Sequence, residues 1–175
     1  MIRYRDATPA DAAALADFAR RAFTETFGHL YSRENLSAFL AGHNEAGWAA
    51  ELADPAFAVR VAEAKSEIAG YLKLGPPSLP FEPSGPCIEL RQLYVLAPWH
   101  GSGAARALMH WALEEARRGG AAEMYLSVFV DNHRARRFYA RYGFTFVQTY
   151  AFMVGSHADE DHIMRLILDR PLPSR

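Results

Sequence analysis

Hydrophobic residues recur at two spacings along this chain, and the change of spacing separates predicted helices from predicted strands. After Thr8-Pro9-Ala10-Asp11, a segment typical of a helix start, apolar residues recur every three or four positions through Phe23. Ser32 and Asn44 can each cap a further helix. Alternating or continuous apolar runs indicate strands at 2–5, 57–63, 68–74, 87–96, 123–130, 144–154 and 162–168.

The order of these segments predicts a single α/β domain over residues 1–175. Two later helices, one after Gly101 and one over 132–142, alternate with strands, and hairpins stand at both ends. This order favours a mixed, mostly antiparallel sheet with helices on both faces. Residues 75–86 hold five prolines and two glycines and predict an irregular loop, whereas the polar residues 155–161 predict a solvated turn between the last two strands.

Composition and charge exclude several classes of protein. Half of the 175 residues are hydrophobic and 22% are charged, which is typical of a globular domain. A net charge of −1 without a basic run argues against a nucleic-acid partner. The chain has no stretch of about 18 uncharged apolar residues, so no membrane span is predicted, and its N-terminus lacks the apolar core of a signal peptide. Cys87 is the single cysteine, so an internal disulfide is excluded. We therefore expect a cytoplasmic protein without a membrane partner, and a homodimer stays open as its assembly state.

The segment 93–108 carries the first functional signal. An apolar strand enters a short turn, and Gly101 and Gly103 then open an amphipathic helix. A helix start without bulky side chains leaves its first backbone amides free to hold a phosphate. The segment therefore predicts a site for a phosphorylated cofactor.

Three glycine-rich phosphate patterns compete for this segment. No lysine follows either glycine, as a P-loop requires, and Arg106 is too bulky for the third position of a dinucleotide fingerprint. The third pattern, R/Q-x-x-G-x-G/A, fits as His100-x-x-Gly103-x-Ala105. An ordinary strand–turn–helix, with glycines that only permit tight packing, remains the alternative.

The segment 126–144 carries the second signal, Asn-x-x-Ala-x-x-Phe-Tyr-x-x-x-Gly-Phe from residue 132. Asn132 and Tyr139 are seven residues apart, so they fall on one face of the predicted helix. A structural role is open for the same residues, because Asn132 is a good helix cap and Phe138 and Phe144 suit a core.

In this order, about 30 residues apart, the two segments resemble the acetyl-coenzyme-A (acetyl-CoA) site of the GNAT N-acetyltransferase superfamily. The resemblance extends to 24–36 and 152–164, which look like the end segments of bacterial polyamine (spermidine/spermine-type) acetyltransferases. It implies a GNAT fold that transfers acetyl from acetyl-CoA to a primary amine, with a small polyamine-like molecule as the first choice of acceptor. A protein N-terminus or lysine is the alternative acceptor, and a non-catalytic acyl-CoA binding or sensing domain is the alternative of another class.

The resemblance also implies which residues hold acetyl-CoA, and two of them depart from the family pattern. His100 stands where Arg or Gln is usual, and Ser102 stands where Gly, Lys or Arg is usual. Phosphate binding is therefore expected to rest on backbone amides and Arg106. The expected cofactor-binding residues are Leu93, Tyr94, Val95, His100, Gly101, Ser102, Gly103, Ala104, Ala105, Arg106 and Asn132.

Acetyl transfer to an amine needs a base, because a free amine is mostly protonated near pH 7. Glu89 is the predicted base, since strand alternation places it on one face with Leu93 and Val95; pairing with a neighbouring arginine is its alternative role. A backbone amide around Leu93–Val95, freed by a bulge or by splayed strands, is expected to hold the oxyanion. The resemblance implies that Tyr139 protonates the leaving thiolate. Ser127 stands where ribosomal-protein N-terminal acetyltransferases of the superfamily carry the glutamate that is their usual base.

The acceptor site is predicted at Tyr31 and Glu34, in the segment expected to cover the acceptor pocket. Glu34 can hold a remote ammonium through a charge-assisted bond, or it can be a solvated acid in a first helical turn. The polar residues 157–162 match no closed zinc pattern, so we expect no metal site.

Overall fold

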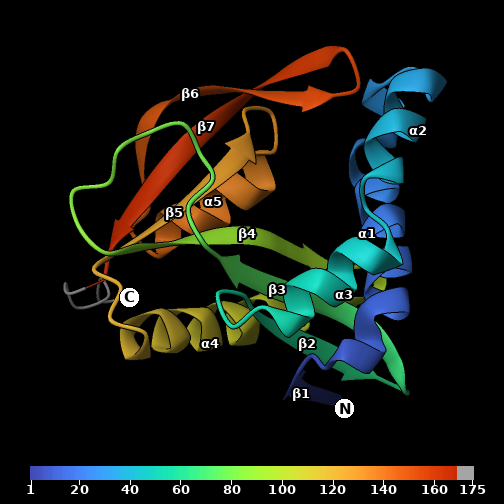
Figure 1. Ribbon diagram of the computed structural model, residues 1–175, viewed down its shortest axis with the longest axis horizontal. Coiled ribbons are helices and arrows are strands. Elements are labelled where there is room, and N and C mark those ends of the chain that lie inside the picture. The colour runs from blue at the N-terminus through green and yellow to red at the C-terminus, as the bar shows by residue number, and fades with distance from the viewer. Residues whose placement is uncertain (169–175) are drawn as a thin grey trace.

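The protein, described here over residues 1–168 by a computed structural model, is built on one seven-stranded sheet (Figure 1). The strand order is β1-β2-β3-β4-β5-β7-β6, and every pair of neighbours is antiparallel except the parallel pair β4 and β5. This confirms the predicted mixed, mostly antiparallel sheet. The strands are β1 (Ile2–Asp6), β2 (Ala58–Ala64), β3 (Glu67–Gly75), β4 (Cys87–Val95), β5 (Glu123–Phe129), β6 (Thr145–Val154) and β7 (His157–Ile167).

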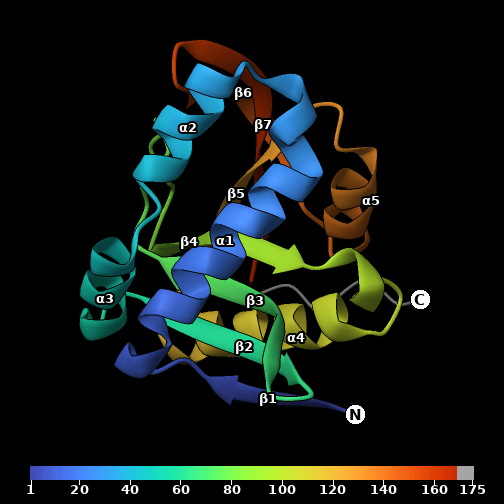
Figure 2. The same ribbon diagram turned by 90° about the vertical axis from the view of Figure 1, so that its right-hand side faces the viewer.

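Helices cover both faces of the sheet, as predicted (Figure 2). On one face lie α1 (Ala12–Phe27), α2 (Arg33–Ala41) and α3 (Glu45–Ala53), and on the other lie α4 (Ala104–Arg118) and α5 (His133–Arg141). Each face has its own apolar core: α1 and α3 pack around Tyr71, and α4 and α5 pack around Leu108.

The predicted helix caps are confirmed where α2 and α3 begin. The Ser32 hydroxyl accepts a hydrogen bond from the Asn35 amide at 3.2 Å, and the Asn44 side chain accepts one from the Gly47 amide at 2.9 Å. These bonds satisfy amides that have no partner within the helix. They fix where α2 starts, and α2 forms one side of the cavity described below.

The parallel pair β4 and β5 separates early. The two strands pair over Cys87–Glu89 and Glu123–Tyr125, and their ladder ends there. On the other side of β4, Lys73 pairs with Gln92 and the next residue of β3 pairs with Leu90, so Arg91 is the extra residue of a β-bulge. Of the two alternatives expected around Leu93–Val95, the splay is present on the β5 side, whereas the bulge lies earlier, at Arg91.

The bulge overturns the predicted strand alternation. Leu90, Leu93 and Val95 all contact the core on the α4 side, which strict alternation across Arg91 would forbid. Because the extra residue shifts the pattern by one, Glu89 faces away from Leu93 and Val95 instead of sharing their side. The prediction that these three residues share one face was wrong.

The hairpin between β6 and β7 also differs from prediction. The predicted turn 155–161 shrinks to Gly155 and Ser156, because β7 begins at His157 and pairs with Val154. Gly155 has a φ of +59°, and an added Cβ would lie 2.4 Å from the Asn35 side chain of α2. Asn35 accepts hydrogen bonds from the Ser156 amide and hydroxyl at 2.9 and 3.0 Å, which holds the hairpin against α2.

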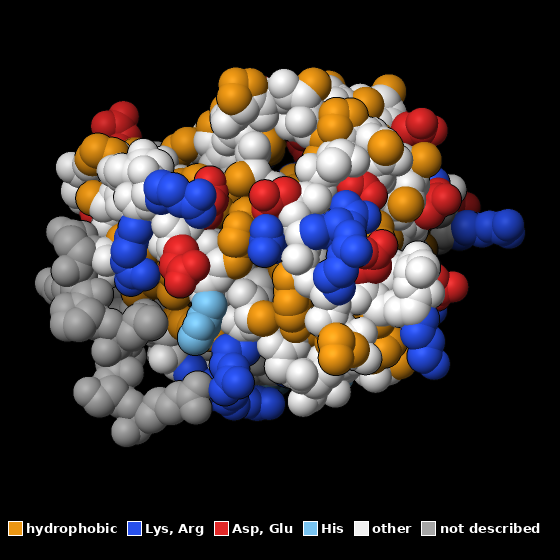
Figure 3. Space-filling view, turned by 90° about the horizontal axis from the view of Figure 1, so that it is seen from below, with side chains coloured by type: hydrophobic (Ala, Val, Ile, Leu, Met, Phe, Trp, Pro, Cys, Tyr) orange, Lys and Arg blue, Asp and Glu red, His pale blue; other side chains and the backbone are white. Residues whose placement is uncertain are grey.

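Basic and acidic side chains are interspersed on the face formed around β1 and α4 (Figure 3). Among residues 1–168, no helix is both long enough and apolar enough to cross a membrane.

Candidate active site

A cavity of about 400 Å³ opens where β4 and β5 separate. Its wall is formed by α1, the start and end of α2, β4, β5, α5 and the β6–β7 hairpin. Its size is in the range of small-molecule sites. The splayed strands thus create a pocket that reaches from the start of α5 to the helices on the opposite face.

One wall of the cavity is aromatic. Phe23 of α1 lies 4.4 Å from Phe39 of α2 between ring centroids, and Phe39 lies 5.6 Å from Phe152 of β6. Phe27 meets Phe129 of β5 edge-on at 6.2 Å. These pairs tie α1 and α2 to the diverging strands and give the cavity an apolar side.

Two buried carboxylates face this wall from β7. Asp159 and Asp161 are 7% and 5% exposed, and both line the cavity. Asp159 accepts hydrogen bonds from the Tyr31 hydroxyl and from Nε2 of His157, the latter at 3.1 Å. Burial raises the pKa of Asp161 to about 7; a hydrogen bond from the Ser127 hydroxyl opposes that rise, and the nearby charge of Asp159 adds to it.

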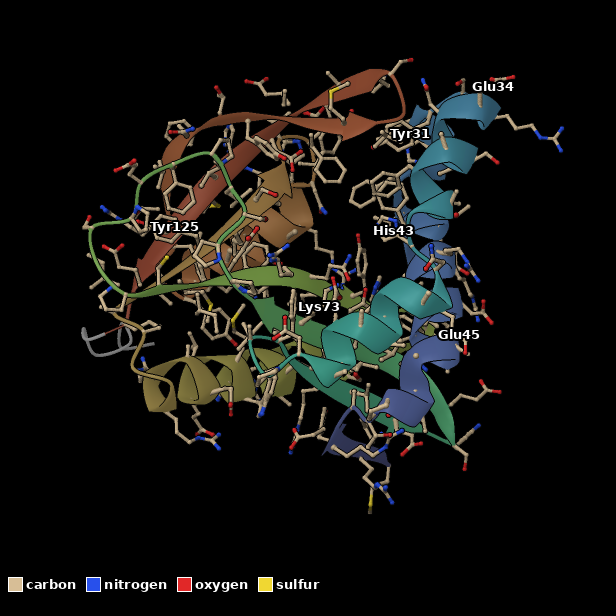
Figure 4. The ribbon with its side chains drawn as sticks, viewed as in Figure 1. Tyr31, Glu34, His43, Glu45, Lys73 and Tyr125 are labelled. Atoms are coloured by element: carbon tan, nitrogen blue, oxygen red, sulfur yellow. The ribbon has the colours of Figure 1, made fainter. Side chains whose placement is uncertain are left out.

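The nearby cationic side chains are turned elsewhere. Arg91 borders the cavity, but its guanidinium donates to the Pro76 carbonyl at 2.6 and 3.0 Å. The ammonium of buried Lys73 pairs with Glu51 next to Trp48, outside the cavity lining (Figure 4). Among residues 1–168, no lysine or arginine side chain pairs with Asp159 or Asp161, which favours a cationic ligand in the cavity.

Tyr139 closes the α5 side of the cavity. It is 8% exposed, its ring packs edge-on against Phe138 and Phe144, and burial raises the pKa of its hydroxyl. A tyrosine with a raised pKa stays protonated at neutral pH, so its hydroxyl is present as a hydrogen-bond donor. Asn132 and Ala135 line the cavity on the same helix; Asn132 also caps α5 by accepting from the Ala135 amide at 3.2 Å.

The glycine segment has the open geometry expected of a phosphate site. Gly101 and Gly103 have φ values of +79° and +89°, and an added Cβ at either would meet no atom within 4 Å. Gly103 is the cap residue of α4, so Ala104, Ala105 and Arg106 form its first turn. Amides of a first turn have no partner within the helix and point outward. These residues fit a bound pyrophosphate.

His100 connects this turn to α5. Its Nε2 donates to the Val95 carbonyl at 2.7 Å, and its Nδ1 accepts from the guanidinium of Arg134. The ring therefore holds an arginine beside the phosphate turn, where sequence reasoning had expected Arg106 to supply the charge. Arg106 is exposed in the first turn of α4.

Of the predicted catalytic and acceptor residues, Glu89 and Glu34 lie outside the cavity, and of the predicted cofactor residues Val95 and the turn from His100 to Arg106 also lie beyond its lining. Glu89, the predicted base, accepts from the Ser78 amide and hydroxyl at 2.8 Å each and pairs with Arg91 at 3.2 Å. Its carboxylate anchors the loop after β3, which matches its alternative role. Glu34 is exposed at the outer end of α2 (Figure 4). Tyr31, predicted beside it, does line the cavity, as do Leu93 and Tyr94.

Sequence reasoning missed Asp159 and Asp161, because it treated them as part of a solvated turn. Alternation was the available signal: Asp159, Asp161 and Ile163 are buried in β7, while Glu160 between them is exposed. Three polar residues in such a run look like a loop unless the alternation is weighed. Within residues 1–168, no group of three or more His, Cys, Asp or Glu side chains is arranged to hold a metal ion.

Comparisons with known proteins agree with this geometry. Residues 13–144 match the model of the acetyltransferase (GNAT) family. An uncharacterized N-acetyltransferase of Mycobacterium tuberculosis is 36% identical over 155 residues, which cover 88% of this chain and 96% of that protein. An aminoalkylphosphonate N-acetyltransferase of Salmonella typhimurium is 35% identical over 98 residues, 56% of this chain and 63% of that protein.

A solved structure with the same fold was crystallised with the cofactor. The PaiA N-acetyltransferase of Thermoplasma acidophilum, in complex with coenzyme A, superposes with a TM-score of 0.78 at 22% identity, covering 95% of this chain and 99% of that one. The family match spans most of the chain, and the relatives are N-acetyltransferases. The chain therefore belongs to the GNAT acetyltransferase family and is an acyl-CoA-dependent N-acetyltransferase that uses acetyl-CoA as its co-substrate.

Proposed function

We propose that the enzyme transfers the acetyl group to a primary amine of a small, polyamine-like cation. The observation that carries the proposal is the pair of buried carboxylates, Asp159 and Asp161, facing an aromatic wall in one cavity. Polyamines carry ammonium groups along an apolar chain, so they need an acid for the remote charge and an apolar surface for the methylenes. Both parts are present here.

The cofactor end of the site is assigned to the turn before α4. The first-turn amides of Ala105 and Arg106 hold the pyrophosphate in this proposal, together with Arg134 next to His100, while the Ala104 amide donates to the Ser102 hydroxyl at 3.3 Å. The acyl arm then lies between β4 and β5, with the Leu93–Val95 backbone as oxyanion donor and Tyr139 as the acid for the leaving thiolate.

The acceptor end is assigned to Tyr31 and Asp159, with Asp159 in the role first expected of Glu34. Tyr31 donates to Asp159 and lies stacked at 5.9 Å from Phe23, so the acid and the aromatic wall are joined. A small acceptor agrees with the aminoalkylphosphonate specificity named for the Salmonella relative. A phosphonate itself would face repulsion from two carboxylates, which favours an amine without an anionic group.

An amine panel tests the proposal. Thiol release from acetyl-CoA is measured with spermidine, a monoamine of similar length, a peptide N-terminus and a peptide lysine. Spermidine should give the highest kcat/KM. A peptide acetylated far faster than any polyamine would transfer the function to protein acetylation, and coenzyme A binding without thiol release from any amine would indicate a non-catalytic domain.

A substitution separates the acceptor contact from the chemistry. Asp159→Asn should raise KM for spermidine about 10- to 100-fold, since a charge-assisted bond contributes about 1.5–3 kcal/mol. The monoamine should lose less, because it has no second ammonium to place at Asp159. The effect should lie mainly in KM, because a remote contact is equal in ground and transition states. Glu160→Gln, an exposed acid on the same strand, is the matched control.

A further inference from the structure

Asp161 occupies a position from which it can act on an amine near Tyr139. It lies opposite Phe129 in the β5–β7 ladder, and Ser127, two residues away on the same face of β5, donates its hydroxyl to the carboxylate. Ser127 and Asp161 both line the cavity. A carboxylate from β7 thus stands beside the small residue that β5 presents there.

The electrostatic neighbours of Asp161 tie it to the thiol end of the cavity. Its charge adds to burial in raising the pKa of Tyr94, and Tyr94 in turn adds to burial in raising the pKa of Tyr139. Asp161, Tyr94 and Tyr139 all line the same cavity, and Tyr139 stands at its α5 end.

The other candidate bases are held by different partners. Glu89 is bound to Ser78 and Arg91 outside the cavity. His43 borders the cavity and its ring packs on Phe39; its Nδ1 donates to the Phe39 carbonyl at 3.0 Å, which leaves Nε2 to accept a proton, so His43 is the rival base that the test below separates from Asp161. Asp159 accepts bonds at both of its oxygens, from Tyr31 and His157. Asp161 accepts a hydrogen bond from the Ser127 hydroxyl, and its other carboxylate oxygen can accept a proton.

We propose that Asp161 is the general base that takes the proton from the acceptor ammonium. An Asp161 carboxylate oxygen binds that proton, which then passes to water at the cavity mouth. The lone pair of the freed amine nitrogen forms the C–N bond, the C–S bond breaks, and Tyr139 gives its proton to the leaving sulfur. As the amide forms, the nitrogen loses a second proton, which reprotonates Tyr139. One proton, the one that Asp161 passed to water, is therefore released per turnover. This inference rests on an amine acceptor, but not on which amine it is.

The surroundings of Asp161 suit this task. A general base works best when its pKa lies near the working pH, and burial brings Asp161 there. The other titratable or charged groups on the cavity wall are Tyr31, His43, Arg91, Tyr94, Tyr139 and Asp159. Of these, Asp159 acts directly on Asp161 and raises its pKa through repulsion between like charges.

The test is the pH profile of kcat/KM with the best amine of the panel. The wild type should lose activity below about pH 7, the pKa of Asp161. In Asp161→Asn, kcat/KM should be at least about 100-fold lower at pH 7, which is the low end for loss of a general base. Its profile should also lack the fall in activity below pH 7, the acidic limb. Its defect should shrink near pH 10, where free amine is abundant. Asp159→Asn should move the acidic limb of the profile to lower pH, because it removes the neighbouring charge. The control Glu160→Gln should keep the wild-type profile.

Several results would overturn the inference. An Asp161→Asn enzyme within threefold of wild type, or one with an equal defect at every pH, would leave Asp161 a structural role. Loss of the limb in His43→Gln, with Asp161→Asn unaffected, would transfer the role to His43. Binding of coenzyme A by calorimetry checks that each variant folds. A protein acceptor in place of a polyamine would refute the proposed acceptor and leave the Asp161 result intact.

Discussion

Asp161→Asn should stabilise the protein at pH 8, although it removes a residue that we assign to the chemistry. A buried carboxylate with a raised pKa resists ionisation, so the folded state is strained wherever that group is charged. Asparagine keeps the shape and can still bond to the Ser127 hydroxyl, but it carries no charge. Active sites commonly trade stability for function in this way.

The structure gives the magnitude and the pH window. Burial raises the pKa of Asp161 from 3.8 to about 7. At about 1.36 kcal/mol per pKa unit, that shift of about three units is worth about 4 kcal/mol, which we reduce to about 2 kcal/mol because the cavity admits water. Between pH 4 and 7 the folded protein binds more protons at this group than the unfolded chain does. The contribution of Asp161 to the free energy of unfolding of the wild type is therefore fully present below pH 4 and is lost as pH rises through 7.

Urea unfolding of both proteins at pH 4, 6 and 8 measures the difference. Asp161→Asn should be more stable by about 2 kcal/mol at pH 8, or about 4–8 °C in Tm for a chain of this size, and the gap should close towards pH 4. Carboxylates outside the cavity titrate alike in both proteins and cancel in the difference, whereas Asp159, which interacts with Asp161, contributes to it. A variant that is less stable at pH 8, or a gap that does not change with pH, would refute the assignment of a strained, ionisable Asp161.

Three further changes test the rest of the site. Tyr139→Phe keeps the ring and removes the hydroxyl, so turnover measured by thiol release should fall about 100-fold with little change in coenzyme A binding; a change within threefold would make Tyr139 a packing residue. Gly103→Asp should weaken coenzyme A binding in calorimetry at least about tenfold, or about 1.4 kcal/mol, because it adds a carboxylate at the phosphate turn. Arg134→Gln should weaken it about two- to fivefold, as expected for an exposed charge, and the loss should shrink at high salt.

The fold was predictable because local signals determine most of it. Ser32 and Asn44 predict the caps of α2 and α3, and Gly101 and Gly103 predict the turn before α4. The bulge at Arg91 has no such local signal, since it arises from the pairing of β4 with β3, and it reverses the side on which Glu89 lies. A single unpaired residue was enough to misplace the predicted base.

The turn before α4 was predictable from the sequence, whereas the lining of the cavity was not. Gly101 and Gly103 form the open turn that their spacing predicted, because such a turn is determined locally. The cavity lining instead depends on which polar residues the β6–β7 hairpin buries, and tertiary contacts such as those of Asn35 with Ser156 and of Tyr31 with Asp159 place that hairpin. Arg134 was missed for the same reason, because His100 reaches it across 34 residues of sequence.

A crystal structure of the enzyme with coenzyme A and spermidine is the most direct test of the central claim. We predict the thiol within hydrogen-bond reach of the Tyr139 hydroxyl, the reacting amine within reach of Asp161, and the remote ammonium at Asp159. Coenzyme A bound away from the separation of β4 and β5, or an acceptor bound outside this cavity, would contradict the account.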